Sequence, residues 1–180
     1  MTLDQESGST GAEHLCQECG ICCTGAVLSG GRLEPSELAF AEQHRLRVVQ
    51  TQKGPAFAHP CPLLVDKCCT AYSERPKTCR AFRCRILRSL ESGSLTEDQA
   101  RERISELLRR ITAIESALES DARHALWWAA ALLGDPDTNE AQRAELSEML
   151  EEVLPDLTEL RRLTNEWIAS PDDLAEWSKP

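Results

Sequence analysis

The sequence predicts a mainly α-helical protein, in which an irregular cysteine-rich domain is followed by a small helical bundle. Three observations lead to this fold class. All nine cysteines of the 180-residue chain lie between Cys16 and Cys84. The second half repeats apolar residues at helical spacing. Residues 1–90 hold 11 Lys and Arg against 9 Asp and Glu, a net charge of +2, whereas residues 91–180 hold 9 against 21, a net charge of −12.

The first half contains few signals for regular structure. Residues 1–12 are polar and contain Gly, Ser and Thr, which predicts a disordered tail. Pro35 precedes an amphipathic stretch, so we expect a short helix with proline in its first turn. Residues 47–52 (RVVQTQ) predict a strand. We expect irregular segments around the cysteines, because metal-binding loops take their shape from the ion.

The second half predicts three or four helices. The first begins near Thr96 and carries apolar residues at the i, i+3, i+4 and i+7 positions, namely Ile104, Leu107, Leu108, Ile111, Ile114 and Leu118. Residues 122–133 are apolar nearly all round and end at Gly134-Asp135-Pro136, a strong stop signal. A third helix should be kinked or ended by Pro155, and the apolar pattern continues to Trp167. Packed together, these faces would form a bundle.

The nine cysteines favour metal binding over disulfides. The N-terminal segment MTLDQESGSTGAEH lacks the apolar run of a secretory signal, and no apolar stretch of about 18 residues predicts a membrane span. We therefore expect a cytoplasmic protein without membrane contact, in which thiols stay reduced unless a metal holds them.

The first cysteine group has the spacing of a ferredoxin motif. Cys16, Cys19 and Cys22 are each three residues apart, as in the C-x₂-C-x₂-C run whose cysteines share one cubane cluster. Cys23 follows at once, and because adjacent side chains diverge, Cys22 and Cys23 are expected to serve different metals or different corners of one cluster. The remaining five cysteines must converge through folding. Eight ligands suit two tetrahedral sites, or one cubane and one further ion, which leaves one thiol spare.

The cysteine pattern resembles the YkgJ-type cysteine-cluster family, also called CxxCxxCC, which is a zinc- or iron-chelating domain. The order CxxCGxCC, C-x-L-L and C-x-x-Y-x-x-R-P-x-x-C-R matches at residues 16–23, 61–64 and 69–82. In that pattern the cysteine three residues before Tyr72 is the shared one, so Cys68 is the departure. The resemblance implies a metal-binding domain over residues 13–90, whereas the charge and the apolar periodicity predict an acidic helical domain over residues 91–180. The implied ligands are Cys16, Cys19, Cys22, Cys23, Cys61, Cys69, Cys79 and the less regular Cys84.

Three functions are compatible with this pattern. The first is an iron–sulfur protein, with a [4Fe–4S] cluster in a redox or electron-transfer role. The second is a structural zinc module whose acidic helical half binds a protein partner. The third follows from one branch of the family, which looks like flagellin lysine N-methylase, so a component of a protein-modifying enzyme is a further alternative. Whether the chain is an enzyme stays open.

The charged and aromatic residues near the cysteines suggest a supporting role. Six cations lie between Arg75 and Arg88, and we expect them to compensate the charge of the thiolates. A net charge of −10 argues against general nucleic-acid binding. Tyr72 is expected in a turn that aims cysteines at the centre. His14 and His59 are weaker ligand candidates because enough thiols are available.

Overall fold

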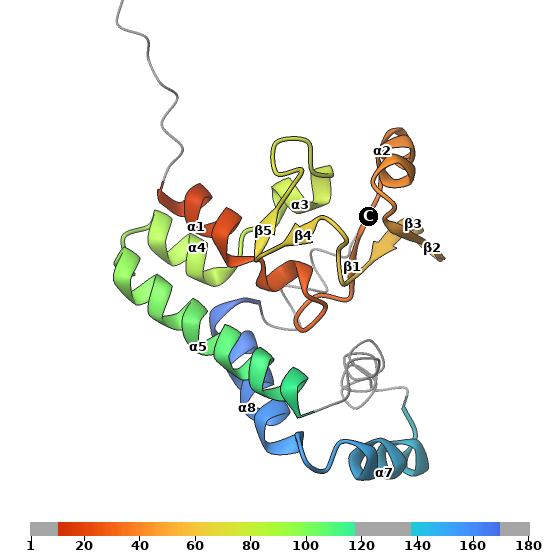
Figure 1. Ribbon diagram of the computed structural model, residues 1–180, viewed down its shortest axis with the longest axis vertical. Coiled ribbons are helices and arrows are strands. Elements are labelled where there is room, and N and C mark those ends of the chain that lie inside the picture. Colours follow the sequence, from red (N-terminus) through yellow and green to blue (C-terminus); the bar gives the residue numbers. More distant parts are fainter. Residues whose placement is uncertain (1–10, 118–137, 170–180) are drawn as a thin grey trace, which may run out of the picture.

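The computed structural model describes residues 11–117 and 138–169, and it is helix-rich with two small antiparallel sheets (Figure 1). The prediction of a mainly helical chain is confirmed at this level. The helix expected over residues 122–133 lies outside the described residues, so a complete bundle stays a prediction. Within the described part, no helix is both long and apolar enough to cross a membrane.

The cysteine-rich half is more regular than predicted. It begins with a helix that buries Ala12 and Leu15, and a 3₁₀ turn follows. Apolar residues with helical or alternating spacing therefore form regular elements around the cysteines, where we expected irregular loops. These elements are α1 (Gly11–Cys19), η1 (Ile21–Cys23), β1 (Gly30–Arg32), β3 (Gly54–Ala58), β4 (Leu64–Val65), β5 (Cys68–Cys69) and α3 (Lys77–Ala81).

Two predicted elements of this half are confirmed. The stretch after Pro35 forms η2 (Pro35–Glu37) and α2 (Leu38–Gln43), with proline at the start. Residues 47–51 form β2 (Arg47–Thr51). β2 pairs with β3, which also pairs with β1, so the antiparallel sheet has the order β1-β3-β2. A second sheet is the short hairpin β4–β5.

The helices of the second half follow the predicted periodicity. α5 (Glu97–Ser116) begins at Thr96, whose side chain accepts the N–H of Gln99 in a capping box. α4 (Arg85–Glu91) precedes it, and α7 (Glu140–Met149) and α8 (Leu154–Trp167) follow. The expectation that Pro155 kinks or ends a helix is wrong, because Pro155 lies in the first turn of α8, where its missing N–H costs nothing.

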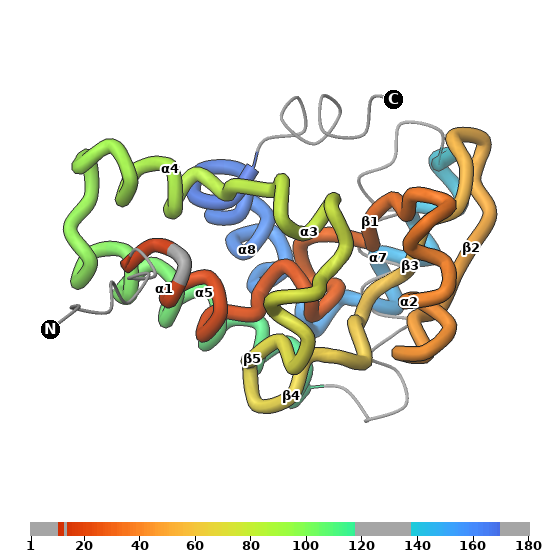
Figure 2. Tube along the Cα trace, turned by 90° about the horizontal axis from the view of Figure 1, so that it is seen from above, coloured from red at the N-terminus to blue at the C-terminus, as the bar shows by residue number. Residues whose placement is uncertain are grey.

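The buried residues form two separate cores. The larger one, here called the helix core, joins α1, η1, α4, α5 and α8, and includes Leu15, Ile21, Ile86, Leu107 and Leu160. The smaller one, the sheet core, lies between α2 and the three-stranded sheet and consists of Leu33, Ala41, Leu46 and Phe57. In Figure 2, α1, α4 and α5 gather at one end, and α2 and the three-stranded sheet lie at the other. The predicted domain limits stay predictions, and the helix core contains residues from both sides of residue 90.

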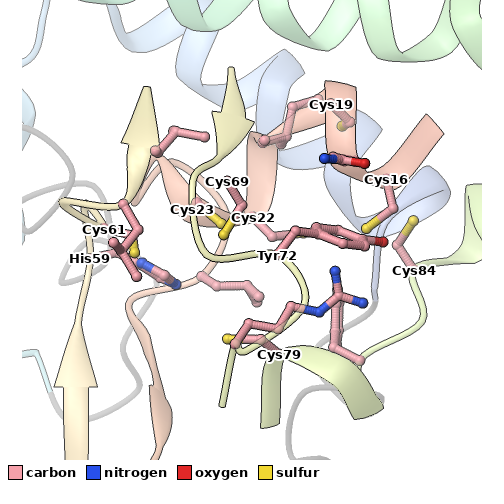
Figure 3. Close-up of a pocket in the computed structure, with 18 of the residues that line it drawn as sticks. Cys16, Cys19, Cys22, Cys23, His59, Cys61, Cys69, Tyr72, Cys79 and Cys84 are labelled. Atoms are coloured by element: carbon pink, nitrogen blue, oxygen red, sulfur yellow. The ribbon is translucent and has the colours of Figure 1, made fainter. Parts of the chain in front are cut away.

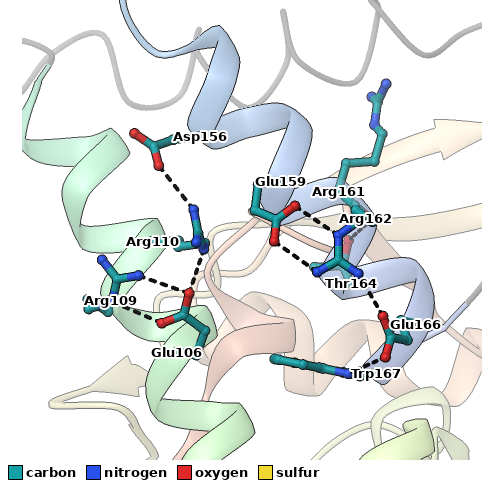
Figure 4. Close-up of polar contacts among 10 residues, drawn as sticks. All are labelled: Glu106, Arg109, Arg110, Asp156, Glu159, Arg161, Arg162, Thr164, Glu166 and Trp167. Atoms are coloured by element: carbon teal, nitrogen blue, oxygen red, sulfur yellow. Dashed lines mark hydrogen bonds and ion pairs between the residues drawn. The ribbon is translucent and has the colours of Figure 1, made fainter.

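Polar contacts along α5 and α8 accompany this packing. Arg110 on α5 contacts Glu106 at 2.7 Å and Asp156 on α8 at 3.2 Å (Figure 4). Arg162 pairs with Glu159 and Glu166 within α8. Partly exposed pairs of this kind contribute only about 0–1 kcal/mol each, so the apolar contacts hold the two helices together.

Candidate metal centre

Eight of the nine cysteines line one cavity of about 110 Å³ between the two cores (Figure 3). A cavity that holds one water needs only roughly 15 Å³, so this space accommodates a small inorganic group. All nine cysteines are free thiols, and Cys68 alone among them is exposed and absent from the cavity wall. The lining cysteines are Cys16, Cys19, Cys22, Cys23, Cys61, Cys69, Cys79 and Cys84.

The local structure of residues 16–23 explains how four cysteines reach this cavity. Cys16 and Cys19 are three residues apart in α1 and therefore share a face. Gly20 then takes a left-handed conformation with φ 63°, which ends α1 and starts η1. Cys22 and Cys23 are neighbours in η1, where three residues complete a turn, so their side chains diverge by about 120°.

Gly20 is also the point at which α1 meets the β4–β5 hairpin. A Cβ atom at this position would lie 2.6 Å from the Lys67 carbonyl oxygen and 2.7 Å from Leu64 Cδ1. Lys67 and Asp66 form the two-residue turn of the hairpin, both with positive φ. The close approach of this backbone to Gly20 holds the hairpin, and with it Cys69, against the turn between α1 and η1 that leads to Cys23.

We expect Gly20→Ala to destabilise the protein and to lower its metal content. The left-handed conformation costs about 1–2 kcal/mol for a residue with a Cβ, and the overlap with Lys67 adds to this cost. Gly93→Ala is the matched control, since Gly93 has φ 72° but open space around its Cβ position. Urea unfolding should show a larger loss for Gly20→Ala, and elemental analysis should show lost metal only there. Equal losses in both variants would contradict this role of Gly20.

The other four cysteines are brought to the cavity by separate elements. The backbone N–H of Cys61 donates to the Cys23 carbonyl at 2.9 Å. Cys69 lies in β5 opposite Leu64. Cys79 lies in α3, whose first backbone N–H, that of Lys77, donates to Glu37 Oε1 at 2.6 Å.

Cys84 is the N-cap of α4, and its sulfur accepts the N–H of Leu87 at 3.5 Å. This cap orients Cys84 towards the helix core and the cavity. In the sequence, Cys84 was the least regular of the implied ligands. Its approach to α1 depends on the packing of α4, which local spacing does not encode.

Burial makes these thiols hard to ionise without a metal. It raises the pKa of Cys19 and of Cys79 from about 9 to about 12. Desolvation is the largest cause in both, as it is for the raised pKa values of Cys22, Cys23, Cys61 and Cys84. At neutral pH these six cysteines are therefore protonated in the metal-free chain, and a metal must displace their protons to bind.

This protonation predicts two opposite effects of pH. Metal affinity should increase as pH rises, because fewer protons compete for the thiolates; calorimetry in buffers of different ionisation enthalpy measures the protons released on binding zinc. The metal-free chain should behave oppositely. Because folding raises the pKa of Cys19, which packs against the helix core, its contribution to the stability of that core is complete below about pH 9 and is lost between pH 9 and 12. Zinc binding that releases no protons at neutral pH would contradict this prediction.

The electrostatic neighbours of the thiols fall into two groups. After burial, the pKa of Cys22 is raised mainly by Cys84 and Cys19. The pKa of Cys23 is raised mainly by Cys61, Cys79 and Cys69. The pKa of Cys84 is raised by Cys16, and the pKa of Cys79 is raised by Cys61 and Cys69. For Cys22 and Cys23 the larger contributions come from cysteines of one group, and smaller ones cross between the groups, from Cys23 to Cys22 and from Cys16 to Cys23.

Tyr72 and Arg75 occupy the space beside the first of these groups. The Arg75 guanidinium carbon lies 3.5 Å from the centre of the Tyr72 ring, and Tyr72 is hydrogen-bonded to Arg75 and Cys16. In Figure 3 the Tyr72 hydroxyl points towards Cys16 and Cys84. Arg75 Nε is buried without a hydrogen-bond partner in the described structure. A buried cationic donor of this kind suits a site that gathers negatively charged thiolates.

The other polar residues of interest have different surroundings. His59 lines the cavity near Cys61, its Nδ1 is buried without a partner among the described residues, and burial lowers its pKa to about 4, so it is neutral at pH 7. His14 instead lies on the surface, 3.2 Å from Glu18. Of the six cations between Arg75 and Arg88, Arg75 lines the cavity. The sequence signal for the role of Arg75 was the Arg-Pro motif that follows Tyr72.

The donor set fits a soft metal centre. Thiolates are the ligands of zinc and of iron–sulfur clusters, and the wall around them is mainly apolar. In the described residues, no three Cys, His, Asp or Glu side chains are arranged to hold a metal ion as they stand. Neutral thiols form only weak hydrogen bonds, so nothing in the chain itself draws their sulfurs together. The eight lining cysteines would hold the metal centre, and Arg75 would donate a hydrogen bond to it. When bound, an iron–sulfur cluster supplies reversible one-electron chemistry.

Comparison with known proteins agrees with this donor set. The model of the family CxxCxxCC, described as "Putative zinc- or iron-chelating domain", matches residues 15–106. The match begins in α1 and ends within α5, so it includes all nine cysteines. No curated protein and no solved structure matches the chain.

Proposed function

The chain belongs to the CxxCxxCC family of zinc- or iron-chelating domains, and from this premise we propose that it binds an iron–sulfur cluster with a redox or electron-transfer role. The observation that carries the proposal is the wall of eight cysteines around one cavity. Eight thiols exceed what a single structural ion needs, since zinc in such sites takes four ligands.

Two further features support iron and sulfide over a single ion. The spacing of Cys16, Cys19 and Cys22 is that of bacterial ferredoxins. The guanidinium of Arg75 supplies a buried donor with an unused N–H, and hydrogen bonds to sulfur tune the potential of iron–sulfur clusters. Both features are compatible with a cluster that changes its oxidation state in a water-poor environment.

The alternative is a structural zinc module whose helical half binds a protein partner. The all-thiol donor set favours it as well, because closed sites with four cysteines are a common form of structural zinc. In that case the two groups of four thiols would hold two zinc ions and no redox chemistry would follow.

Anaerobic purification separates the two functions. We expect brown protein that contains iron and acid-labile sulfide, and whose visible absorption bleaches on reduction with dithionite. Colourless protein with two zinc ions per chain and no sulfide would overturn the iron–sulfur proposal and leave the zinc module.

Single cysteine variants test the ligand assignment. Cys19→Ser should lose metal, because Cys19 lies on the cavity-facing side of α1. Cys68→Ser is the matched control and should retain the full metal content, because Cys68 is exposed on the hairpin. Iron, zinc and sulfide are measured per chain in both. Loss of metal in Cys68→Ser, or its retention in Cys19→Ser, would contradict the assignment.

A further inference from the structure

The two hydrophobic cores divide the cysteines. Four cysteines pack against the helix core: Cys16, Cys19, Cys22 and Cys84. Cys61 and Cys79 pack against the sheet core. The backbone joins the remaining two cysteines to Cys61 and Cys79. The carbonyl of Cys23 accepts the N–H of Cys61. Cys69 lies in the β4–β5 hairpin, which follows Cys61 in the chain. We call these groups the helix-core cysteines and the sheet-core cysteines (Cys23, Cys61, Cys69 and Cys79).

The boundary between the groups falls between two adjacent residues. Cys22 and Cys23 are neighbours in η1, so their side chains leave the backbone in directions about 120° apart. Ile21 and Cys22 contact the helix core, whereas Cys23 is absent from that core and its carbonyl accepts the N–H of Cys61. This divergence favours ligation of different centres by the two adjacent cysteines.

The ends of the cavity agree with this division. Figure 3 places Cys16 and Cys84 at one end, beside the Tyr72 hydroxyl, and Cys61 with His59 at the other. The Tyr72 ring extends between the ends and is covered by Arg75 at 3.5 Å. This half-buried ring, with a cation on its face, has its hydroxyl at the Cys16 and Cys84 end of the cavity, away from Cys61 and His59.

We propose that the eight cysteines form two separate four-thiolate sites, one made by the helix-core cysteines and the other by the sheet-core cysteines. The helix-core site holds the iron–sulfur cluster, and the sheet-core site holds one tetrahedral ion of the zinc class. The placement of the cluster rests on the proposed function, whereas the division of the ligands does not. The ferredoxin spacing occurs within the helix-core cysteines, and Cys84 completes their set of four.

Cadmium tests the division on the unaltered chain. The reduced, metal-free protein is loaded with ¹¹³Cd, and proton–cadmium correlation spectra connect each ion to the β-protons of its cysteines. We expect two cadmium signals, one correlated with each group of four, and no cadmium–cadmium coupling. A signal correlated with members of both groups, or coupled signals from a bridged centre, would overturn the division even though the chain binds metal. A chain that binds neither cadmium nor iron would overturn the proposed function as well.

Two variants then locate the cluster. Cys84→Ser keeps an oxygen acceptor for the N-cap of α4, so it removes a soft ligand while preserving the helix start. It should lose iron and sulfide and keep its one zinc ion. Cys61→Ser should lose zinc and keep iron and sulfide. Loss of both metals in either variant with unchanged far-ultraviolet circular dichroism, or the reverse pattern, contradicts the placement. If either variant unfolds, the cadmium correlations of the unaltered chain decide the division.

Discussion

Removal of the metal should unfold the sheet part of the molecule while most of the helix core survives. The sheet core consists of only four buried residues in the described structure: Leu33, Ala41, Leu46 and Phe57. So small a core is insufficient to order the strands and loops around it, because each ordered residue costs about 1–2 kcal/mol of backbone entropy. Structural zinc contributes roughly 10–16 kcal/mol of folding free energy in small domains, which is enough to offset the entropy cost that this small core leaves uncompensated.

Hydrogen exchange with mass spectrometry measures this effect. After chelation in reducing buffer, the amides of β1, β2, β3 and the β4–β5 hairpin should lose their protection. The amides of α5 and α8 should keep most of theirs, since Leu107 and Leu160 remain buried between these helices. Cys68→Ser serves as the control and should respond to chelator like the unaltered chain. Metal-free protein with full protection of the sheets would contradict the prediction.

Ile21→Ala should cause the largest loss of stability among single substitutions near the site. Ile21 is completely buried, and it lies between Gly20 and Cys22 in contact with the helix core. Truncating a buried isoleucine to alanine costs about 2–5 kcal/mol, through lost apolar burial and the cavity that remains. Because η1 carries both Cys22 and Cys23, its displacement should also weaken metal binding at both sites.

A surface residue provides the control for this substitution. Leu38→Ala truncates a side chain that is 39% exposed on α2, and such changes usually alter the free energy of unfolding by about 0.5 kcal/mol or less. Urea unfolding of the metal-loaded variants compares the two, and competition with a chelator compares their metal affinities. Equal stabilities for both variants would show that η1 is not held by the helix core.

Local patterns were sufficient for several parts of the fold. The capping residue Thr96 and the spacing of Ile104, Leu107, Ile111 and Ile114 predicted α5, because a helix start and an apolar face depend on neighbours within a few residues. The strand over residues 47–51 is confirmed for a similar reason. Pro155 was misjudged because the same residue can end one helix or begin the next, and only the packing of Leu157 and Leu160 favours the second outcome here.

By itself, the sequence determined that the cysteines gather for metal chemistry and that Cys68 differs from the other eight, because spacing and residue type are properties of the chain. It left open how the eight divide. Only the tertiary structure decided that Cys84 lies with Cys16, and Cys61 with Cys23, across separations of some 68 and 38 residues. The physical reason is that such contacts arise from the packing of α4 on the helix core and of the strands on the sheet core, and no local pattern encodes which core a distant cysteine will meet.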